Sequence, residues 1–181
     1  MSTDNPWRTL SSRTVYKNPW ITVREDQVLC PDGSPGIYGV VETRIATGVV
    51  ALTEDNQIYL VGQYRYPLNQ YSWEIPEGGT DGQEAPLVAI KRELKEEAGL
   101  EAAHWEQLGG EIHLSNCISS ERAFLYLARG LTECASAPEH TEVLQVRRMP
   151  FRECVTMVER GEITDGMTII AVLRAARILD L

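Results

Sequence analysis

Positive charge is scarce in this chain, and no basic patch stands out. Its 181 residues include 17 lysines and arginines against 26 aspartates and glutamates, which gives a formal net charge of −9 at pH 7. The densest basic pair in the C-terminal half is Arg147 with Arg148. Binding to a nucleic-acid backbone requires clustered lysine and arginine side chains. The composition therefore predicts that nucleic acid is not a partner.

Long apolar segments are also missing. No hydrophobic run is long enough to cross a bilayer, and the N-terminus lacks the apolar core of a signal peptide. The four cysteines are scattered without a C-x-x-C pair, and the three histidines share no metal-ligand spacing. We therefore expect a cytoplasmic protein with reduced cysteines and no membrane partner.

The apolar residues that are present predict many strands and a few helices. A chain of this length with 43% hydrophobic residues can bury a sizeable core. Strands are expected at residues 14–16, 20–29, 37–44, 48–52, 58–64, 72–75, 105–113, 123–128 and 143–148. Helices are expected at residues 86–98, 151–160 and 167–179. This order of elements predicts an α/β fold, a sandwich with a mixed sheet.

The expected helix at residues 86–98 carries the most informative pattern. A proline stands in its first turn, and Gly99 follows directly, where a helix favours a left-handed stop. Glu93, Glu96 and Glu97 are three or four residues apart and share one face. Carboxylates so placed repel each other, whereas hard divalent cations bind carboxylate oxygens. We therefore expect a metal site on this face, and magnesium in particular is usually held by a few carboxylates plus substrate phosphates.

The spacing around this helix resembles the signature of the Nudix hydrolases. Gly78 is followed after five residues by Glu84 and, after seven more, by Arg92-Glu93-Leu94-x-Glu96-Glu97-x-Gly99-Leu100. Seven such positions, each matched by chance about one time in twenty, would coincide at ~10⁻⁹ per start point. The resemblance implies a Nudix-type α/β/α sandwich with a mixed β-sheet and an N-terminal antiparallel β-subdomain. It also implies metal-dependent cleavage of a diphosphate bond.

The same resemblance assigns roles within this signature, which we call the box (residues 78–100). Glu93, Glu96 and Glu97 would hold Mg²⁺, with Mn²⁺ as the alternative, and Glu96 would also serve catalysis. Arg92 would orient these carboxylates by ion pairing, with Glu84 as a partner.

Glu77, directly before the box, is also an expected metal-binding residue. In related enzymes the backbone carbonyl at this position contributes to the metal site, and the residue is more often alanine. The Glu77 side chain would therefore either point away or add a further carboxylate to the site.

Two segments upstream of the box narrow the resemblance. Gln63-Tyr64-Arg65 and Trp73-Glu74-Ile75-Pro76 look like the subgroup that cleaves ADP-ribose and nucleotide sugars. In this subgroup Arg65 would bind a diphosphate oxygen, because a guanidinium is a forked donor.

A loop downstream of the box bears on the substrate. Residues 115–121 match the loop in which ADP-ribose hydrolases carry a glutamate, here Glu121, but Asn116 stands where a proline is usual. ADP-ribose is thus one expected substrate, and GDP-mannose or ADP-glucose are its competitors.

A second loop would supply the group that activates the attacking water or holds a metal. In related enzymes this is a glutamate placed before a strand such as residues 143–148. Glu142 fits this position best, and Glu139 is the alternative.

The N-terminal residues 1–45 hold more aromatic and β-branched residues than one small sandwich needs. We expect these strands to form a homodimer, with residues 46–181 as the Nudix domain. In the resembling subgroup such a region supplies an aromatic side chain that stacks on the base, here Trp20 or Tyr16.

Two other classes of function compete with this interpretation. A Nudix-fold binding module or regulator would be expected to have a degraded box, and this box is intact. An RNA-processing hydrolase would need a basic surface, which the net charge of −9 contradicts.

Overall fold

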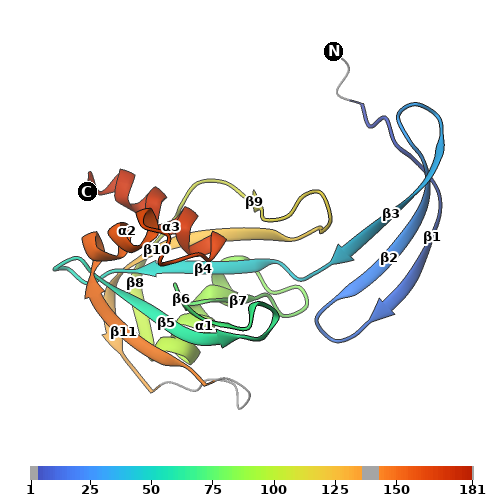
Figure 1. The fold of residues 1–181 in the computed structure, drawn as a ribbon. Coiled ribbons are helices and arrows are strands. Elements are labelled where there is room, and N and C mark those ends of the chain that lie inside the picture. The colour runs from blue at the N-terminus through green and yellow to red at the C-terminus, as the bar shows by residue number, and fades with distance from the viewer. Residues whose placement is uncertain (1–3, 136–142, 181) are drawn as a thin grey trace. The chain divides into compact units, whose positions relative to one another are not determined.

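The computed structural model describes residues 4–135 and 143–180. The chain divides into two compact units. The N-terminal unit contains Met1–Arg44 and the loop Ser115–Glu121, and the large unit contains Ile45–Leu114 and Arg122–Leu181 (Figure 1).

The N-terminal unit is an antiparallel three-stranded sheet. Its strands lie in the order β1 (Arg8–Lys17), β2 (Thr22–Leu29) and β3 (Pro35–Glu42). The loop Ser115–Glu121 is joined to β3, because the Tyr38 hydroxyl donates to the Cys117 carbonyl at 2.9 Å. The N-terminal antiparallel β-subdomain is therefore present as expected.

The large unit contains two sheets. The first has the order β7 (Glu77–Gly79), β4 (Ala46–Ala51), β10 (Arg122–Glu133) and β8 (Leu100–Gln107), with β9 (Ile112–His113) paired to β10. The second has the order β11 (Gln145–Pro150), β5 (Gln57–Arg65) and β6 (Gln70–Glu74). A short 3₁₀ helix, η1 (Tyr66–Leu68), joins β5 to β6. The first sheet is mixed, because β4 pairs in parallel with β10 and antiparallel with β7.

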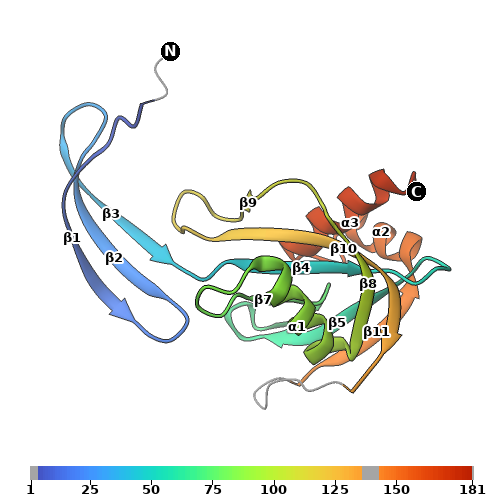
Figure 2. The same ribbon diagram turned by 180° about the vertical axis from the view of Figure 1, so that it is seen from behind.

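Helices cover both faces of the mixed sheet. Figures 1 and 2 show α1 (Pro86–Ala98) on one side, and α2 (Phe151–Glu159) with α3 (Gly166–Ile178) on the other. Successive residues of a strand point to opposite faces. Accordingly, Val49 of β4 packs in a core cluster with residues of α1, while Val50 packs in a cluster with residues of α2 and α3. The expected α/β/α sandwich with a mixed sheet is confirmed.

Among the differences from the sequence-based expectation, two lie in the large unit, at residues 77–79 and 105–113. The strand expected at residues 105–113 is interrupted, because Gly109 turns the chain with a φ of 78° between β8 and β9. The segment Glu77–Gly79 is a short strand, β7, that pairs with β4. Among the described residues, no helix is long and apolar enough to cross a membrane.

Candidate active site

Helix α1 carries the box carboxylates on a rigid support. Its residues Ala89, Ile90 and Leu94 are buried, and the last two lie in the core cluster beneath the helix. The helix ends at Gly99, whose φ of 64° is the left-handed conformation that glycine adopts without strain. The apolar face and this stop fix the axial position of the glutamates, as the sequence pattern predicted.

Arg92 is the centre of the box. Its guanidinium donates to Glu84 Oε2 at 3.1 Å, to Glu93 Oε1 at 2.8 Å and to Glu96 Oε2 at 2.9 Å. It also donates to the Gly79 carbonyl at 3.1 Å. Burial alone would lower the pKa of Arg92, but Glu84 and Glu93 raise it above its ordinary value. The structure thus places a permanent positive charge among the carboxylates.

Glu84 holds the loop before α1 against this arginine. Its carboxylate accepts hydrogen bonds from Arg92 and from the Asp81 backbone N–H, the latter at 3.1 Å. These bonds lower the pKa of Glu84 below its ordinary value of 4.5, with Arg92 the larger cause. Glu84 is therefore ionised and paired near neutral pH.

Strand β7 shapes the site from the opposite side. The Glu77 backbone N–H donates to Glu97 Oε2 at 2.9 Å. A Cβ at Gly78 would lie well under 3.0 Å from the carboxyl carbon of Glu93, so only glycine leaves room for that side chain. The buried hydroxyl of Thr47 on β4 donates to the Gly78 carbonyl at 3.0 Å and fixes this peptide. β7 thereby sets the positions of two box glutamates.

The Glu77 side chain lies in a second acidic group. One carboxylate oxygen from each of Glu74, Glu77 and Asp165 lies within 4.8 Å of the others, and we call these three residues the Glu74 cluster. Burial, followed by the charges of Asp165 and Glu74, raises the pKa of Glu77 well above its ordinary value. Glu77 therefore faces the box through its N–H and the Glu74 cluster through its carboxylate.

Arg65 is bound to this cluster. Its Nε donates to both oxygens of Glu74 at 3.0 Å, and its Nη2 donates to Glu77 Oε1 at 2.8 Å. Burial would lower the pKa of Arg65, but the hydrogen bonds and charge of Glu74 raise it. The Arg65 guanidinium, which was expected to bind a diphosphate, is bound here by the carboxylates of Glu74 and Glu77.

The donor set of the box suits a hard divalent cation. All candidate ligands are carboxylate or backbone carbonyl oxygens, and Mg²⁺ and Mn²⁺ prefer oxygen over nitrogen and sulfur. Glu93 and Glu96 converge on one nitrogen of Arg92, and Glu97 is oriented by the Glu77 N–H. The residues present therefore fit the metal that the sequence pattern predicts.

The predicted base-stacking and loop residues belong to the N-terminal unit. Trp20 is 70% exposed and lines a pocket of about 230 Å³, and Tyr16 is also exposed. Glu121 donates its backbone N–H to the Ser119 hydroxyl at 3.1 Å. Glu142 and Glu139 lie outside the described residues.

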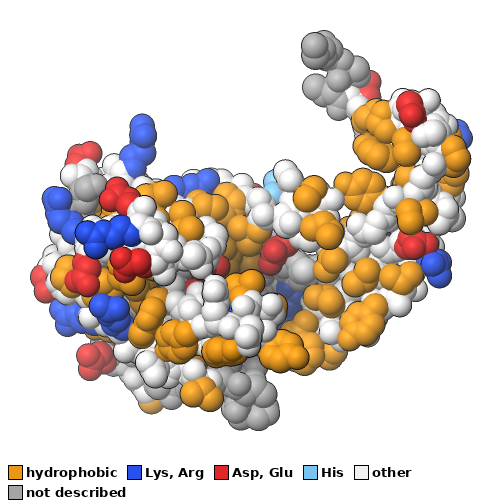
Figure 3. All heavy atoms as spheres, viewed as in Figure 1, with side chains coloured by type: hydrophobic (Ala, Val, Ile, Leu, Met, Phe, Trp, Pro, Cys, Tyr) orange, Lys and Arg blue, Asp and Glu red, His pale blue; other side chains and the backbone are white. Residues whose placement is uncertain are grey.

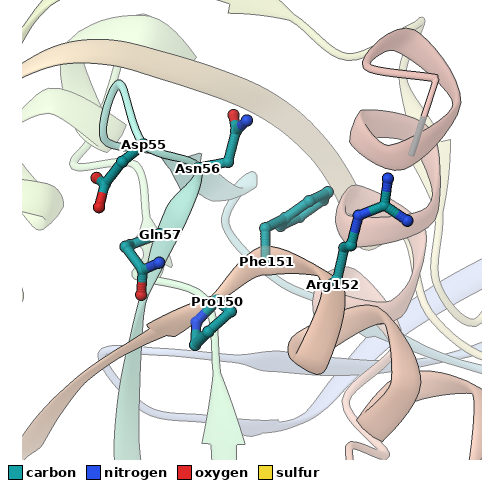
Figure 4. Close-up of a pocket in the computed structure, with 6 residues that line it drawn as sticks. All are labelled: Asp55, Asn56, Gln57, Pro150, Phe151 and Arg152. Atoms are coloured by element: carbon teal, nitrogen blue, oxygen red, sulfur yellow. The ribbon is translucent and has the colours of Figure 1, made fainter.

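A separate pocket of about 240 Å³ lies where the β4–β5 turn meets the start of α2 (Figure 4). Its lining includes Asp55, Pro150 and Arg152, together with Asn56, Gln57 and Phe151. The Phe151 backbone N–H donates to the Asn56 carbonyl at 3.0 Å, which ties the turn to the helix. None of these residues belongs to the box.

Sequence analysis missed two residues that the structure places here. Asp165 is the N-cap of α3 and accepts a hydrogen bond from the Thr168 N–H at 2.7 Å. An aspartate directly before a helical pattern is a known capping signal, so that role could have been found. Thr47 has no such signal, because its contact with Gly78 joins residues 31 positions apart.

Comparisons with known proteins agree with this geometry. Residues 42–167 match the NUDIX domain, and residues 7–41 match the nucleoside diphosphate sugar hydrolase N-terminal domain. An ADP-ribose pyrophosphatase of Mycobacterium tuberculosis is 34% identical over 173 residues, covering 94% of this chain and 83% of the relative. A methanol dehydrogenase activator of Bacillus methanolicus is 30% identical over 167 residues, covering 91% of this chain and 90% of the relative.

A solved structure described as an ADP compounds hydrolase superposes with a TM-score of 0.87 at 21% identity. It covers 99% of this chain and 97% of its own, and at this identity the likeness establishes the fold alone. The domain match and the relatives confirm the resemblance carried by the box. The chain therefore belongs to the Nudix family and is a pyrophosphohydrolase of that family.

Proposed function

We propose that this enzyme hydrolyses the diphosphate bond of ADP-ribose or a related nucleoside diphosphate sugar. The products are a nucleoside monophosphate and a sugar phosphate. The observation that carries the proposal is the assembled box, in which Arg92 binds Glu84, Glu93 and Glu96 while β7 holds Glu97. Two supporting observations are the relative named ADP-ribose pyrophosphatase and the match to the sugar hydrolase N-terminal domain.

Glu93, Glu96 and Glu97 would hold Mg²⁺, with Mn²⁺ as the alternative, and the backbone carbonyl of Glu77 would contribute. When bound, such an ion neutralises developing charge and lowers the pKa of water. The contribution of Arg92 is to keep Glu93 and Glu96 in place, with Glu84 buttressing it. Glu142 would take the proton of the attacking water, and Glu139 is the alternative.

Further residues would take part in substrate selection. Arg65 would face the diphosphate with the part of its side chain that stays exposed, about 35%. In the N-terminal unit Glu121 would bind substrate and Trp20 or Tyr16 would stack on the base. The substituted Asn116 keeps GDP-mannose and ADP-glucose as rivals of ADP-ribose.

The direct test is a product assay on purified protein. ADP-ribose, GDP-mannose, ADP-glucose, diadenosine polyphosphates and nucleoside triphosphates are each supplied with Mg²⁺ or Mn²⁺, and monophosphate release is measured. We expect the highest kcat/KM for one of the nucleoside diphosphate sugars. A preference for triphosphates would contradict the substrate class, and no turnover at all would favour a nucleotide-binding regulator.

The proposal includes a homodimer built on the N-terminal unit. This unit exposes several large apolar side chains: Leu10, Tyr16 and Ile37 on its strands and Trp20 in the turn between β1 and β2. Figure 3 shows hydrophobic side chains, in orange, over β1–β3. Burying such a surface against a second copy is favourable by about 25 cal/mol per Å². Light scattering should give twice 20.3 kDa at micromolar concentration. In this proposal the N-terminal strands of one copy help to form the nucleotide pocket of the other, and a fully active monomer would rule that out. A cytoplasmic location stays a prediction.

A further inference from the structure

We propose that Glu74, Glu77 and Asp165 bind a divalent cation of the Mg²⁺ and Mn²⁺ type, at a site separate from the box carboxylates. The inference goes beyond the proposed hydrolysis and does not depend on the substrate.

The first observation is the convergence of three carboxylates from distant parts of the chain. Glu74 ends β6, Glu77 begins β7 and Asp165 caps α3, yet one oxygen from each lies within 4.8 Å of the other two. Two ligands on opposite sides of one ion with bonds of ~2.1 Å are about 4.2 Å apart. Small side-chain rotations would therefore bring all three oxygens onto one ion.

The second observation is an oxygen without a partner. Glu77 Oε2 is buried and has no hydrogen-bond partner among the residues that the structure describes, whereas Glu77 Oε1 accepts from Arg65. The whole side chain is only 8% exposed. An unsatisfied buried carboxylate oxygen costs free energy, and native proteins rarely leave one without a hydrogen bond or an ion.

The charges point to a divalent ion. Three ionised carboxylates bring three negative charges, and Arg65 returns one positive charge, so the cluster has a net charge of −2 when all are ionised. A proton on Glu77 would remove only one of these charges, and a divalent cation removes both. Asp165 is half-buried rather than sealed, which leaves a route for the ion.

The ion would act on the box through one peptide. The Glu77 N–H holds Glu97, so fixing the Glu77 carboxylate also steadies the peptide that orients this box glutamate. Asp165 extends the connection to α3, because its carboxylate caps that helix at the Thr168 N–H. Glu77 and Asp165 are thus positioning residues for the box, with the ion as their common partner.

The experiment counts bound Mn²⁺ by the electron paramagnetic resonance of the free ion at equilibrium. It compares the full-length wild type with D165N, E77Q, E93Q/E97Q and the triple variant D165N/E93Q/E97Q. Asparagine caps a helix as well as aspartate does, so D165N keeps α3 capped while removing the charged ligand. D55N is the matched control, because Asp55 is an exposed aspartate paired with Arg148 outside both acidic groups.

We expect D165N to bind one Mn²⁺ fewer than wild type and D55N to bind the same number. E93Q/E97Q should retain one Mn²⁺ that the triple variant loses, and E77Q should lose the same ion. Anomalous diffraction at the manganese edge should show a peak beside Glu74, Glu77 and Asp165 in E93Q/E97Q crystals.

An unchanged Mn²⁺ count in D165N would overturn the proposal, since Asp165 would then hold no ion. The proposal would also be overturned if the Mn²⁺ that E93Q/E97Q retains were still bound by the triple variant. Circular dichroism confirms that each variant is folded. A wild type that turns over no nucleoside diphosphate sugar would refute the proposed function without changing these counts.

Discussion

Two arginines, one on each side of β7, gather carboxylates in similar ways but with different exposure to solvent. Arg92 binds Glu84, Glu93 and Glu96, whose side chains are 16%, 14% and 31% exposed. Arg65 binds Glu74 and Glu77, which are 4% and 8% exposed. The carboxylates of the first group can be reached by solvent and by a metal ion, whereas those of the second are largely shielded, and only Arg65 itself stays partly exposed, at 35%.

The same difference appears in the pKa values. Hydrogen bonds from Arg92 lower the pKa of Glu84, because that carboxylate keeps some solvent and has a close cation. Burial raises the pKa of Glu77, because desolvation exceeds the attraction of Arg65. Solvent exposure therefore decides whether the pKa of a carboxylate paired with an arginine is lowered, as in Glu84, or raised, as in Glu77.

Among substitutions that test the difference between the two arginine-centred groups, the largest effect is expected at Glu97. We expect E97Q to lower kcat by about 10³-fold, because a metal ligand contributes ~4 kcal/mol of transition-state stabilisation. The isosteric amide still accepts the Glu77 N–H, so the fold should be kept. Product release at saturating Mg²⁺ measures the effect, with E101Q as control, since Glu101 is exposed and paired with Lys95. Wild-type turnover by E97Q would refute the proposed metal site.

The next largest effect is expected at Gly78. In G78A the new methyl group would collide with the Glu93 carboxyl group, which must then leave its position. Activity should fall about 10- to 100-fold, whereas stability should change little, because the end of the Glu93 side chain can move aside. Kinetics and urea unfolding measure both quantities. The control is G110A, because a Cβ at Gly110 would meet nothing within 4 Å. Equal effects of the two substitutions would show that Gly78 has no special relation to Glu93.

Local patterns account for what the sequence could predict. The bounds of α1 and its stop at Gly99 were predicted correctly, because helical periodicity and capping involve residues only a few positions apart. The order of strands and helices also indicated the mixed α/β sandwich. By contrast, β1 runs over Arg8–Lys17 although only residues 14–16 were expected, because the whole strand is exposed and has no buried face to create a pattern.

Contacts between distant residues account for what was missed. The Glu74 cluster joins β6, β7 and the start of α3, and the Ile75 N–H donates to the buried Thr168 hydroxyl across 93 positions. No spacing within a single segment of the sequence predicts that these residues come into contact. The fate of the Glu77 side chain was open for the same reason, since its partners include Asp165, far along the chain.

The loop glutamate gives a third, smaller test. E142Q should lower kcat by about 10- to 100-fold with little change in KM, because a group that acts on the attacking water mainly affects the chemical step. Steady-state kinetics of E142Q and E139Q separate the two candidates. If only E139Q slows turnover, the assignment passes to Glu139 and Glu142 is dispensable. Either result would identify a catalytic carboxylate other than those described around Arg92 and Arg65.

The smallest expected effect concerns Glu84 and pH. The folded-state pKa of Glu84 lies below its ordinary value of 4.5, so its ionised form stabilises the fold. That contribution is fully present above pH 4.5 and is lost as the pH falls through the folded-state pKa. E84Q should therefore cost about 1 kcal/mol at pH 7 and progressively less towards pH 3. Urea unfolding of both proteins across this range measures the difference. A cost that stays constant with pH would mean that the packing of Glu84, and not its charge, stabilises the fold. The pKa difference between the groups around Arg92 and Arg65 would then not be explained by solvent exposure.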